Sequence, residues 1–128
     1  MQLRTHLKID KSLSGEVIEL SEGYAKLRLK TDQRMVADEY GLVHGGFIFS
    51  LADFCAMVVV NEPTVVLGQA SMKFLKPVKV EEELVAEGKV ERSEGRKRWV
   101  KVEVKRGKEK IAEGEFFCII TEKHVLSQ

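Results

Sequence analysis

One long apolar stretch constrains this chain more than any other feature. After His44, Gly45 and Gly46, the segment up to Asn61 holds a single charged side chain, Asp53, and apolar residues fall on almost every side of a helical wheel. A helix of this kind must be covered by other parts of the protein on nearly all sides. It is too short, and too often interrupted by Gly and polar residues, to be a convincing membrane span. We therefore predict that it is the central helix of a soluble domain.

The acid in this helix is a candidate functional side chain. Burying an ionised carboxylate without a partner is costly, and perturbed acids in clefts gather at active sites. Two structural explanations stand beside a functional one, because Asp53 could cap a neighbouring helix or pair with a distant Lys or Arg. Gly45 and Gly46 favour function, since glycines at a helix start leave backbone N–H groups open at the positive end of the helix dipole. Such donors can stabilise an oxyanion.

Length, charge and cysteine content limit the remaining choices. A chain of 128 residues has room for one core, so we expect one domain over residues 1–128. The formal net charge of +1 shows no bias toward nucleic acid or membrane, and we expect neither as a partner. The N-terminus lacks a secretory signal and Cys55 and Cys118 lie in apolar segments, which indicates a reduced, cytoplasmic protein. Cys55 is interpreted as a packing residue rather than a nucleophile.

The chain before the central helix predicts a hairpin and a loop. Residues 15–20 and 24–29 alternate apolar and polar side chains around a turn, with Ala25, Leu27 and Leu29 pointing one way. Residues 3–13 fit either a short helix or an irregular arm. Residues 31–42 have no clean period and are predicted to form a loop that leads into the helix.

The chain after the helix predicts strands. The residue before Pro63 is pushed out of helical geometry, so the helix ends there. Residues 64–80 are predicted to contain one long strand, or two broken at Gly68, ending at Lys76-Pro77. Further strands are predicted over residues 84–90, 98–104 and 110–121, with tight turns at Gly95 and Gly107. The result is an α+β protein with its helix on one face of a single antiparallel sheet. Either the sheet curls around the helix or a second subunit closes the open side.

An ordered set of motifs carries a resemblance to a known family. His44-Gly45-Gly46 precedes Leu51-Ala52-Asp53, the segment QASMKFLKP follows at residues 69–77, and Gly95-Arg96-Lys97-Arg98 comes next. In this order the motifs resemble those of the hotdog-fold acyl-CoA thioesterases of the phenylacetate-pathway type. The resemblance implies a curled antiparallel sheet wrapped around a long central helix. It also implies hydrolysis of an acyl- or aryl-CoA thioester to the free acid and CoA.

The resemblance also implies roles for individual residues. Gly45 would give its N–H to the thioester oxygen, and Asp53 would act as general base or nucleophile. His44 beside them could be a catalytic base, a hydrogen-bonding prop for the loop or the boundary of the helix, and the prop is favoured because the carboxylate already fills the base role. The residues expected to help bind substrate are Asp38, Gly46, Ser71, Lys73, Lys76, Gly95, Arg96 and Lys97.

Three expectations concern ligands. The basic residues are candidates for the phosphates of CoA, with a merely solvated face as the alternative. No cofactor is expected beyond the CoA that forms part of the substrate. No metal is expected either, because His6, His44 and His124 show no ligand spacing.

The spacing of Gly45 and Asp53 predicts a shared site. On one helix the two residues are separated by about 12 Å along the axis, so they cannot touch the same carbonyl. If two helices run antiparallel across a two-fold axis, Gly45 of one subunit comes opposite Asp53 of the other. We therefore expect a homo-oligomer, either a dimer or a dimer of dimers, with sites at the subunit interface.

Two other functions are alternatives to a thioesterase. One is a non-catalytic hotdog module that binds acyl-CoA as a sensor or carrier, and the other is a dehydratase of the same fold.

Overall fold

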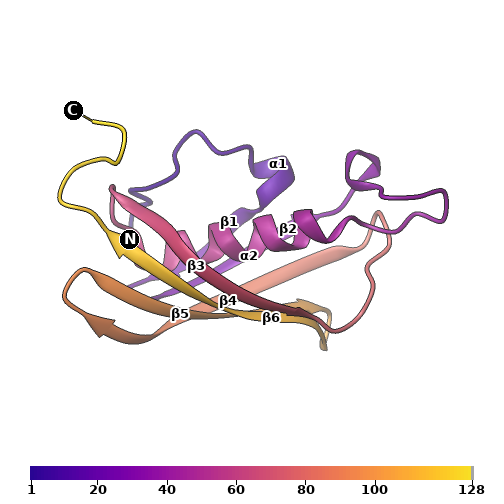
Figure 1. Cartoon of the computed structure of the whole chain (residues 1–128). Helices are drawn as coiled ribbons and strands as arrows, with labels where there is room; N and C mark the ends of the chain where they lie inside the picture. Colours follow the sequence, from indigo (N-terminus) through magenta and orange to yellow (C-terminus); the bar gives the residue numbers. More distant parts are fainter. Residues whose placement is uncertain (128) are drawn as a thin grey trace.

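The computed structural model describes residues 1–127 and contains one sheet and one long helix. The helical elements are α1 (Lys11–Ser14), a 3-10 turn (Gln33–Met35) and α2 (Gly45–Val60); the strands are β1 (Glu16–Ser21), β2 (Tyr24–Lys30), β3 (Val65–Phe74), β4 (Glu83–Glu94), β5 (Lys97–Arg106) and β6 (Glu109–Ile120). The six strands are ordered β1-β2-β4-β5-β6-β3, and every neighbouring pair is antiparallel. The sheet curls around α2, which confirms the predicted α+β architecture (Figure 1).

Each predicted strand is present, but the strand after the helix ends at Phe74 rather than at Lys76-Pro77, because residues 75–82 form a loop; the structure also settles the question at Gly68. Residues 65–74 form one strand whose register against β6 shifts between Leu67 and Gln69, so Gly68 is the extra residue of a β-bulge. Strands β4, β5 and β6 follow one another as the predicted meander. The turns between them have Gly95 and Gly107 at φ values of 58° and 62°, a conformation that glycine adopts without strain.

Helix α2 lies very close to the sheet. Ala25, Leu27 and Leu29 of β2 point toward it as predicted and are buried. A Cβ on Gly88 of β4 would lie only 3.0 Å from Val59 Cγ2 and 3.1 Å from Cys55 Sγ, so glycine permits this close approach. Cys55 is buried, and burial raises the pKa of its thiol, which agrees with a packing role. Among residues 1–127, no helix is both long and apolar enough to cross a lipid bilayer.

The first residues form the irregular arm, and the helical alternative for residues 3–13 is wrong apart from the short α1. Asp10 caps α1 by accepting a hydrogen bond from the Ser12 N–H at 2.9 Å. Leu3, Ile9 and Leu13 nevertheless pack against the core. The spacing of the apolar residues therefore indicated that they pack on the core. An irregular arm can bury such residues as well as a helix can.

Two loops meet at the N-terminal end of α2. The segment 31–44 precedes the helix, and the segment 75–82 connects β3 to β4 on the same side of the molecule (Figure 1). Isolated bridges join Val36 to Val43 within the first loop and Leu42 to Lys79 between the loops. The start of α2 is therefore placed by both loops.

Candidate active site

His44 caps the helix that carries the site. Its backbone is extended, at φ −61° and ψ 132°, and its Nδ1 accepts a hydrogen bond from the Gly46 N–H at 2.8 Å. This geometry corresponds to the helix-boundary interpretation of His44. It also corrects the expectation that both glycine N–H groups are open, because the imidazole occupies that of Gly46. Within residues 1–127, the Gly45 N–H has no hydrogen-bond acceptor.

The two glycines differ in how much space surrounds them. A Cβ on Gly46 would lie 2.7 Å from His44 Nδ1, so the capping ring needs a glycine at this position. A Cβ on Gly45 would lie 3.7 Å from the Phe74 ring, which is ordinary contact. Packing within this chain therefore requires glycine at residue 46 but not at residue 45.

Asp53 is a partly buried acid that has no hydrogen-bond or ion-pair partner among residues 1–127. Its Oδ1 is buried and accepts no hydrogen bond from any of residues 1–127, and neither the capping role nor the ion pair considered above is formed. Burial raises the pKa of the Asp53 carboxyl to about 6. A carboxyl with this pKa exchanges a proton near neutral pH, as a general base does.

Asp53 lies in the middle of the face of α2 that the sheet leaves uncovered. At about 100° per residue, the helix residues that keep some exposure fall mainly on one side. They are Gly45, Gly46, Phe49, Ser50, Asp53 and Val60, with Phe47 at the margin. The helix that must be covered on nearly all sides thus presents an open stripe with the acid at its centre.

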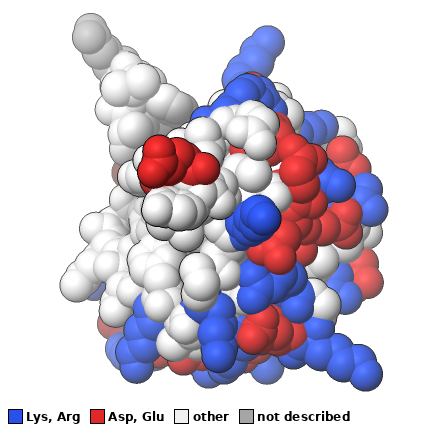
Figure 2. All heavy atoms as spheres, turned by 90° about the vertical axis from the view of Figure 1, so that its right-hand side faces the viewer, with Lys and Arg blue, Asp and Glu red and all other residues white. Residues whose placement is uncertain are grey.

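Two depressions flank the start of α2. One, of about 280 Å³, is lined by Gly45, Phe74, Lys76 and neighbouring residues of the 75–82 loop. The other, of about 590 Å³, lies beside Gly46, Phe47 and Ser50 and is also lined by Leu13 and Ser14 of α1. Figure 2 looks onto this end of the molecule, where a mostly uncharged area lies on the left, with one acidic group inside it and charged groups along its lower edge. The large exposed apolar side chains of the two loops and of the adjoining end of β3 are Val36, Tyr40, Leu42, Phe74 and Leu75.

Among the residues expected to bind substrate, Lys76 is brought to the Gly45 depression. The structure places Asp38 in the loop before α2, where its Oδ1 accepts the N–H groups of Tyr40 and Leu42 at 2.9 and 3.2 Å. This carboxylate therefore holds its own loop together. Phe74 beside Gly45 was not singled out from the sequence, because only the packing of β3 against α2 brings the two residues together.

Other expected substrate-binding residues lie elsewhere in this chain. Ser71 and Lys73 line a depression on the opposite face of β3 from Met72, which packs on the core. The turn that holds Gly95, Arg96 and Lys97 lies at the other end of the sheet, where the Ile120 N–H donates to the Arg96 carbonyl. Within one chain, these groups and the start of α2 form no common site.

Cys118 lies beside the acid. Burial, and then the Asp53 carboxylate, raise the pKa of the Cys118 thiol to about 12. The thiol is therefore protonated at neutral pH and is a poor nucleophile. Across residues 1–127, no three His, Cys, Asp or Glu side chains gather in a group that could hold a metal ion.

The fold and the helix identify the class of protein. An antiparallel sheet curled around one central helix, with an acid midway along that helix, is the hotdog arrangement expected from the sequence. The sequence model of the thioesterase superfamily matches residues 40–113, which is more than half of the chain. The chain belongs to this superfamily, and the predicted hotdog fold is confirmed.

Two curated relatives carry different names. The chain is 51% identical over 119 residues to a methylthioribose-1-phosphate isomerase of Aquifex aeolicus, covering 93% of this chain but 26% of that protein. It is 30% identical over 115 residues to the transcription factor FapR of Caldanaerobacter subterraneus, covering 89% of this chain and 58% of that protein. The chain thus spans about a quarter of the first relative and somewhat more than half of the second.

Solved structures resemble the chain over nearly its whole length. An uncharacterized protein from Pyrococcus horikoshii is 50% identical, with 99% of this chain and 98% of that chain covered and a TM-score of 0.98. A hypothetical thioesterase from Streptococcus pneumoniae, solved with coenzyme A, is 21% identical, with 85% and 87% covered and a TM-score of 0.77. At that identity the second likeness shows the fold alone.

Asp53 is predicted to make stability depend on pH. Its pKa is about 6 in the folded chain and 3.8 as a reference value, so between these pH values the folded chain binds more protons than the unfolded chain. The free energy of unfolding therefore falls as pH rises from about 4 to about 6, by on the order of 2 kcal/mol. Chemical denaturation should show this loss as the difference between the pH profiles of wild type and Asp53→Asn, because the other carboxyls contribute alike to both profiles. Equal pH profiles would contradict a raised pKa.

The two glycines at the start of α2 are predicted to tolerate alanine differently. Alanine at residue 45 meets ordinary contact and gains helix propensity, whereas alanine at residue 46 displaces the His44 ring. Losing a helix cap costs on the order of 1 kcal/mol, so Gly46→Ala should be less stable than Gly45→Ala by about that amount. Denaturant titrations of the two variants measure the difference, and equal stabilities would show that the cap contributes nothing.

Proposed function

We propose that this protein hydrolyses an acyl- or aryl-CoA thioester to the free acid and CoA. The observation that carries the proposal is the unpaired, partly buried Asp53 carboxylate in the middle of the open stripe of α2, with a pKa of about 6. A group with this pKa can take a proton from water at neutral pH, or attack the thioester carbonyl directly. Membership in the thioesterase superfamily supports the same chemistry. Among the types in that superfamily, the phenylacetate-pathway type is the one that the sequence motifs favour.

The start of α2 supplies the second half of the proposed chemistry. The Gly45 N–H stands at the positive end of the helix without an acceptor among residues 1–127. A donor in this position stabilises the charge that develops on a thioester oxygen during attack. The exposed apolar side chains around it, such as Phe74 and Leu42, offer contacts to an acyl or aryl group, and Lys76 offers a cation to CoA.

The proposed active form is a homo-oligomer with a site shared between two subunits. Gly45 and Asp53 lie about 12 Å apart along the axis of α2, which is too far for one carbonyl. A second copy with an antiparallel helix would cover the open stripe and bring its own Asp53 toward Gly45. The same pairing would carry Arg96 and Lys97 of one subunit toward the start of α2 in the other, where they could meet CoA phosphates.

A non-catalytic acyl-CoA sensor is the second candidate. The observation in its favour is the 30% identity to a protein named as a transcription factor, of which the chain spans 58%. A sensor would bind an acyl-CoA through the same fold but would not turn it over. Hydrolysis assays separate the two candidates.

Loss of the Asp53 carboxylate is predicted to lower turnover strongly. A panel of short, long and aryl-CoA thioesters should be assayed by detecting the free CoA thiol, with wild type and Asp53→Asn compared. We expect Asp53→Asn to lower kcat by about 10²–10⁴-fold, the range for a general base, while the variant stays folded. Wild-type activity should rise with pH through about 6, because the base must be deprotonated.

The outcomes of this assay separate the interpretations of Asp53. Retained activity in Asp53→Asn, with a changed melting temperature, would assign the acid a structural role. Binding of the thioesters by wild type without any release of CoA would favour the sensor.

Subunit mixing is predicted to restore activity to two inactive variants. Asp53→Ala removes the acid, and Gly45→Pro removes the N–H donor. Proline is well suited to this position, because residue 45 is the first of the helix and His44 already has extended backbone angles. In a mixed dimer, one site combines Gly45 of the first variant with Asp53 of the second.

The recovered activity has an expected size. An equimolar mixture after complete exchange should regain about a quarter of wild-type activity, because half of the dimers are mixed and each has one complete site of two. Native mass spectrometry verifies exchange. Absence of recovery after verified exchange would contradict the shared site.

A further inference from the structure

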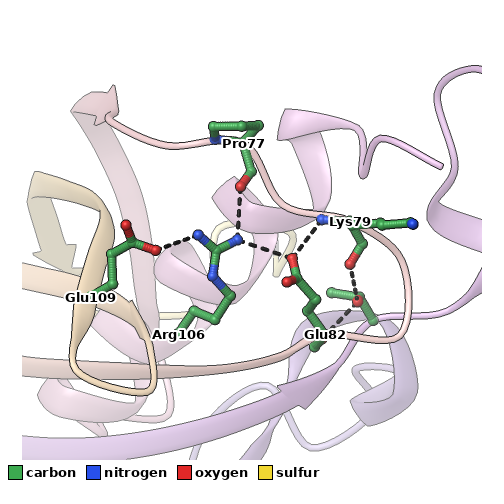
Figure 3. Close-up of polar contacts among 6 residues, drawn as sticks. Pro77, Lys79, Glu82, Arg106 and Glu109 are labelled. Atoms are coloured by element: carbon green, nitrogen blue, oxygen red, sulfur yellow. Dashed lines mark hydrogen bonds and ion pairs between the residues drawn. The ribbon is translucent and has the colours of Figure 1, made fainter. Parts of the chain in front are cut away.

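Arg106 ties together three parts of the protein at the end of the sheet nearest the start of α2. Its Nη1 donates to the Pro77 carbonyl at 2.8 Å and to Glu82 Oε1 at 2.9 Å, and its Nη2 donates to Glu109 (Figure 3). The arginine is the last residue of β5, Glu109 is the first of β6, and Pro77 and Glu82 belong to the loop between β3 and β4. The Arg106 side chain is 26% exposed. We call this set of contacts the Arg106 clamp.

The clamp extends into the backbone of the loop. Glu82 Oε1 also accepts the Lys79 N–H at 2.7 Å, so the same oxygen joins Arg106 to the middle of the loop. Thr31, which directly follows β2, donates a hydrogen bond from its hydroxyl to the Glu82 carbonyl at 2.7 Å. Glu81 has a φ of 79°, which is unfavourable for a residue with a side chain and persists only where neighbouring contacts enforce it. The contacts of Glu82 with Lys79, Thr31 and Arg106 therefore support this loop conformation.

This loop in turn holds the segment that starts α2. The Val43 N–H donates to the Val78 carbonyl at 2.8 Å, and the Val80 N–H donates to the Gly41 carbonyl at 2.9 Å. Val43 directly precedes the cap His44 and the proposed donor Gly45. Residues 74–78 also line the depression beside Gly45. A shift of the loop would thus move both the donor and the wall opposite it.

A contribution to global stability does not account well for the clamp. Exposed ion pairs contribute little to stability, and both acidic partners of Arg106 are on the surface. The planar fork of arginine, however, reaches acceptors on separate elements at fixed angles, which the single ammonium of lysine cannot do. The main effect of the clamp is therefore to fix the position of the 75–82 loop relative to β5 and β6.

We infer that Arg106 is a positioning residue, which acts through the 75–82 loop to hold the start of α2 and the Gly45 N–H in place. Its effect on catalysis rests on the proposed function. Its effect on the position of the loop does not, because the hydrogen bonds of Val43 and Val80 can be followed without any substrate.

The test compares amide hydrogen exchange by NMR in wild type, Arg106→Ala, Arg106→Lys and the control Arg28→Ala. Arg28 is also a surface arginine with an acidic partner, Glu16 at 3.6 Å, but it belongs to the β1–β2 hairpin. In Arg106→Ala, exchange at Val43 and Val80 should accelerate by about threefold to tenfold, because the lost charged hydrogen bonds favour a local opening but their acidic partners are partly exposed. Amides in the centre of the β4–β5 ladder should be unchanged. Arg106→Lys should restore little of the protection, and Arg28→Ala should match wild type.

Turnover provides the second measurement. Because the loop carries both the position of the Gly45 donor and part of the wall of the depression, Arg106→Ala should lower kcat for a CoA thioester by a larger factor than it raises KM. Should Arg106→Ala fail to fold, Glu82→Gln makes the same test, because it weakens the ion pair while an amide oxygen still accepts the Lys79 N–H. Folded variants with wild-type exchange at Val43 and Val80, or with uniform acceleration across the sheet, would overturn the inference. Accelerated exchange at these two residues in a protein that hydrolyses no thioester would support the clamp and count against the proposed function.

Discussion

The packing of an almost wholly apolar helix into a curled sheet is the constraint on which this structure depends. A single sheet covers one side of a helix, and α2 has apolar side chains on nearly every side. Close approach at Gly88 lets the sheet bury Cys55 and Val59 deeply. The opposite side keeps a partly exposed stripe, which the N-terminal arm and α1 cover only at its edges. The open stripe therefore exists because the sheet covers only one side of α2.

Asp53 is the only ionisable side chain in the open stripe of α2, among the described residues. A carboxylate with no partner in the described chain is unfavourable for the fold, and its raised pKa expresses this cost. Structural roles for the acid would have shown themselves as a cap or an ion pair. Neither is formed among residues 1–127, and a second copy of the chain is the proposed source of the missing surroundings.

At the start of α2, exposed apolar side chains lie on loops that are held by hydrogen bonds. Apolar side chains of two loops are exposed there, yet the loops are held by backbone hydrogen bonds and by the Arg106 clamp. A site that stabilises a developing charge needs donors fixed before the substrate arrives. The differing names of the relatives show that proteins resembling this chain include one named as an enzyme and one named as a transcription factor, so function has to be argued from such local geometry rather than from the fold.

The sequence by itself determined the elements and the principal candidate residue. Period-two alternation predicted the strands, because alternate side chains of a strand face the core, and the uninterrupted apolar run predicted α2 with Asp53 as its anomaly. Contacts between distant segments were decided only by the tertiary structure. Among them are the approach of Phe74 to Gly45 and the reach of Arg106 to Pro77. The capture of the Gly46 N–H by His44 is local, yet it depends on a side-chain rotamer that residue types do not specify. Local patterns encode which face of an element is buried, whereas the partners of a side chain depend on how the whole chain packs.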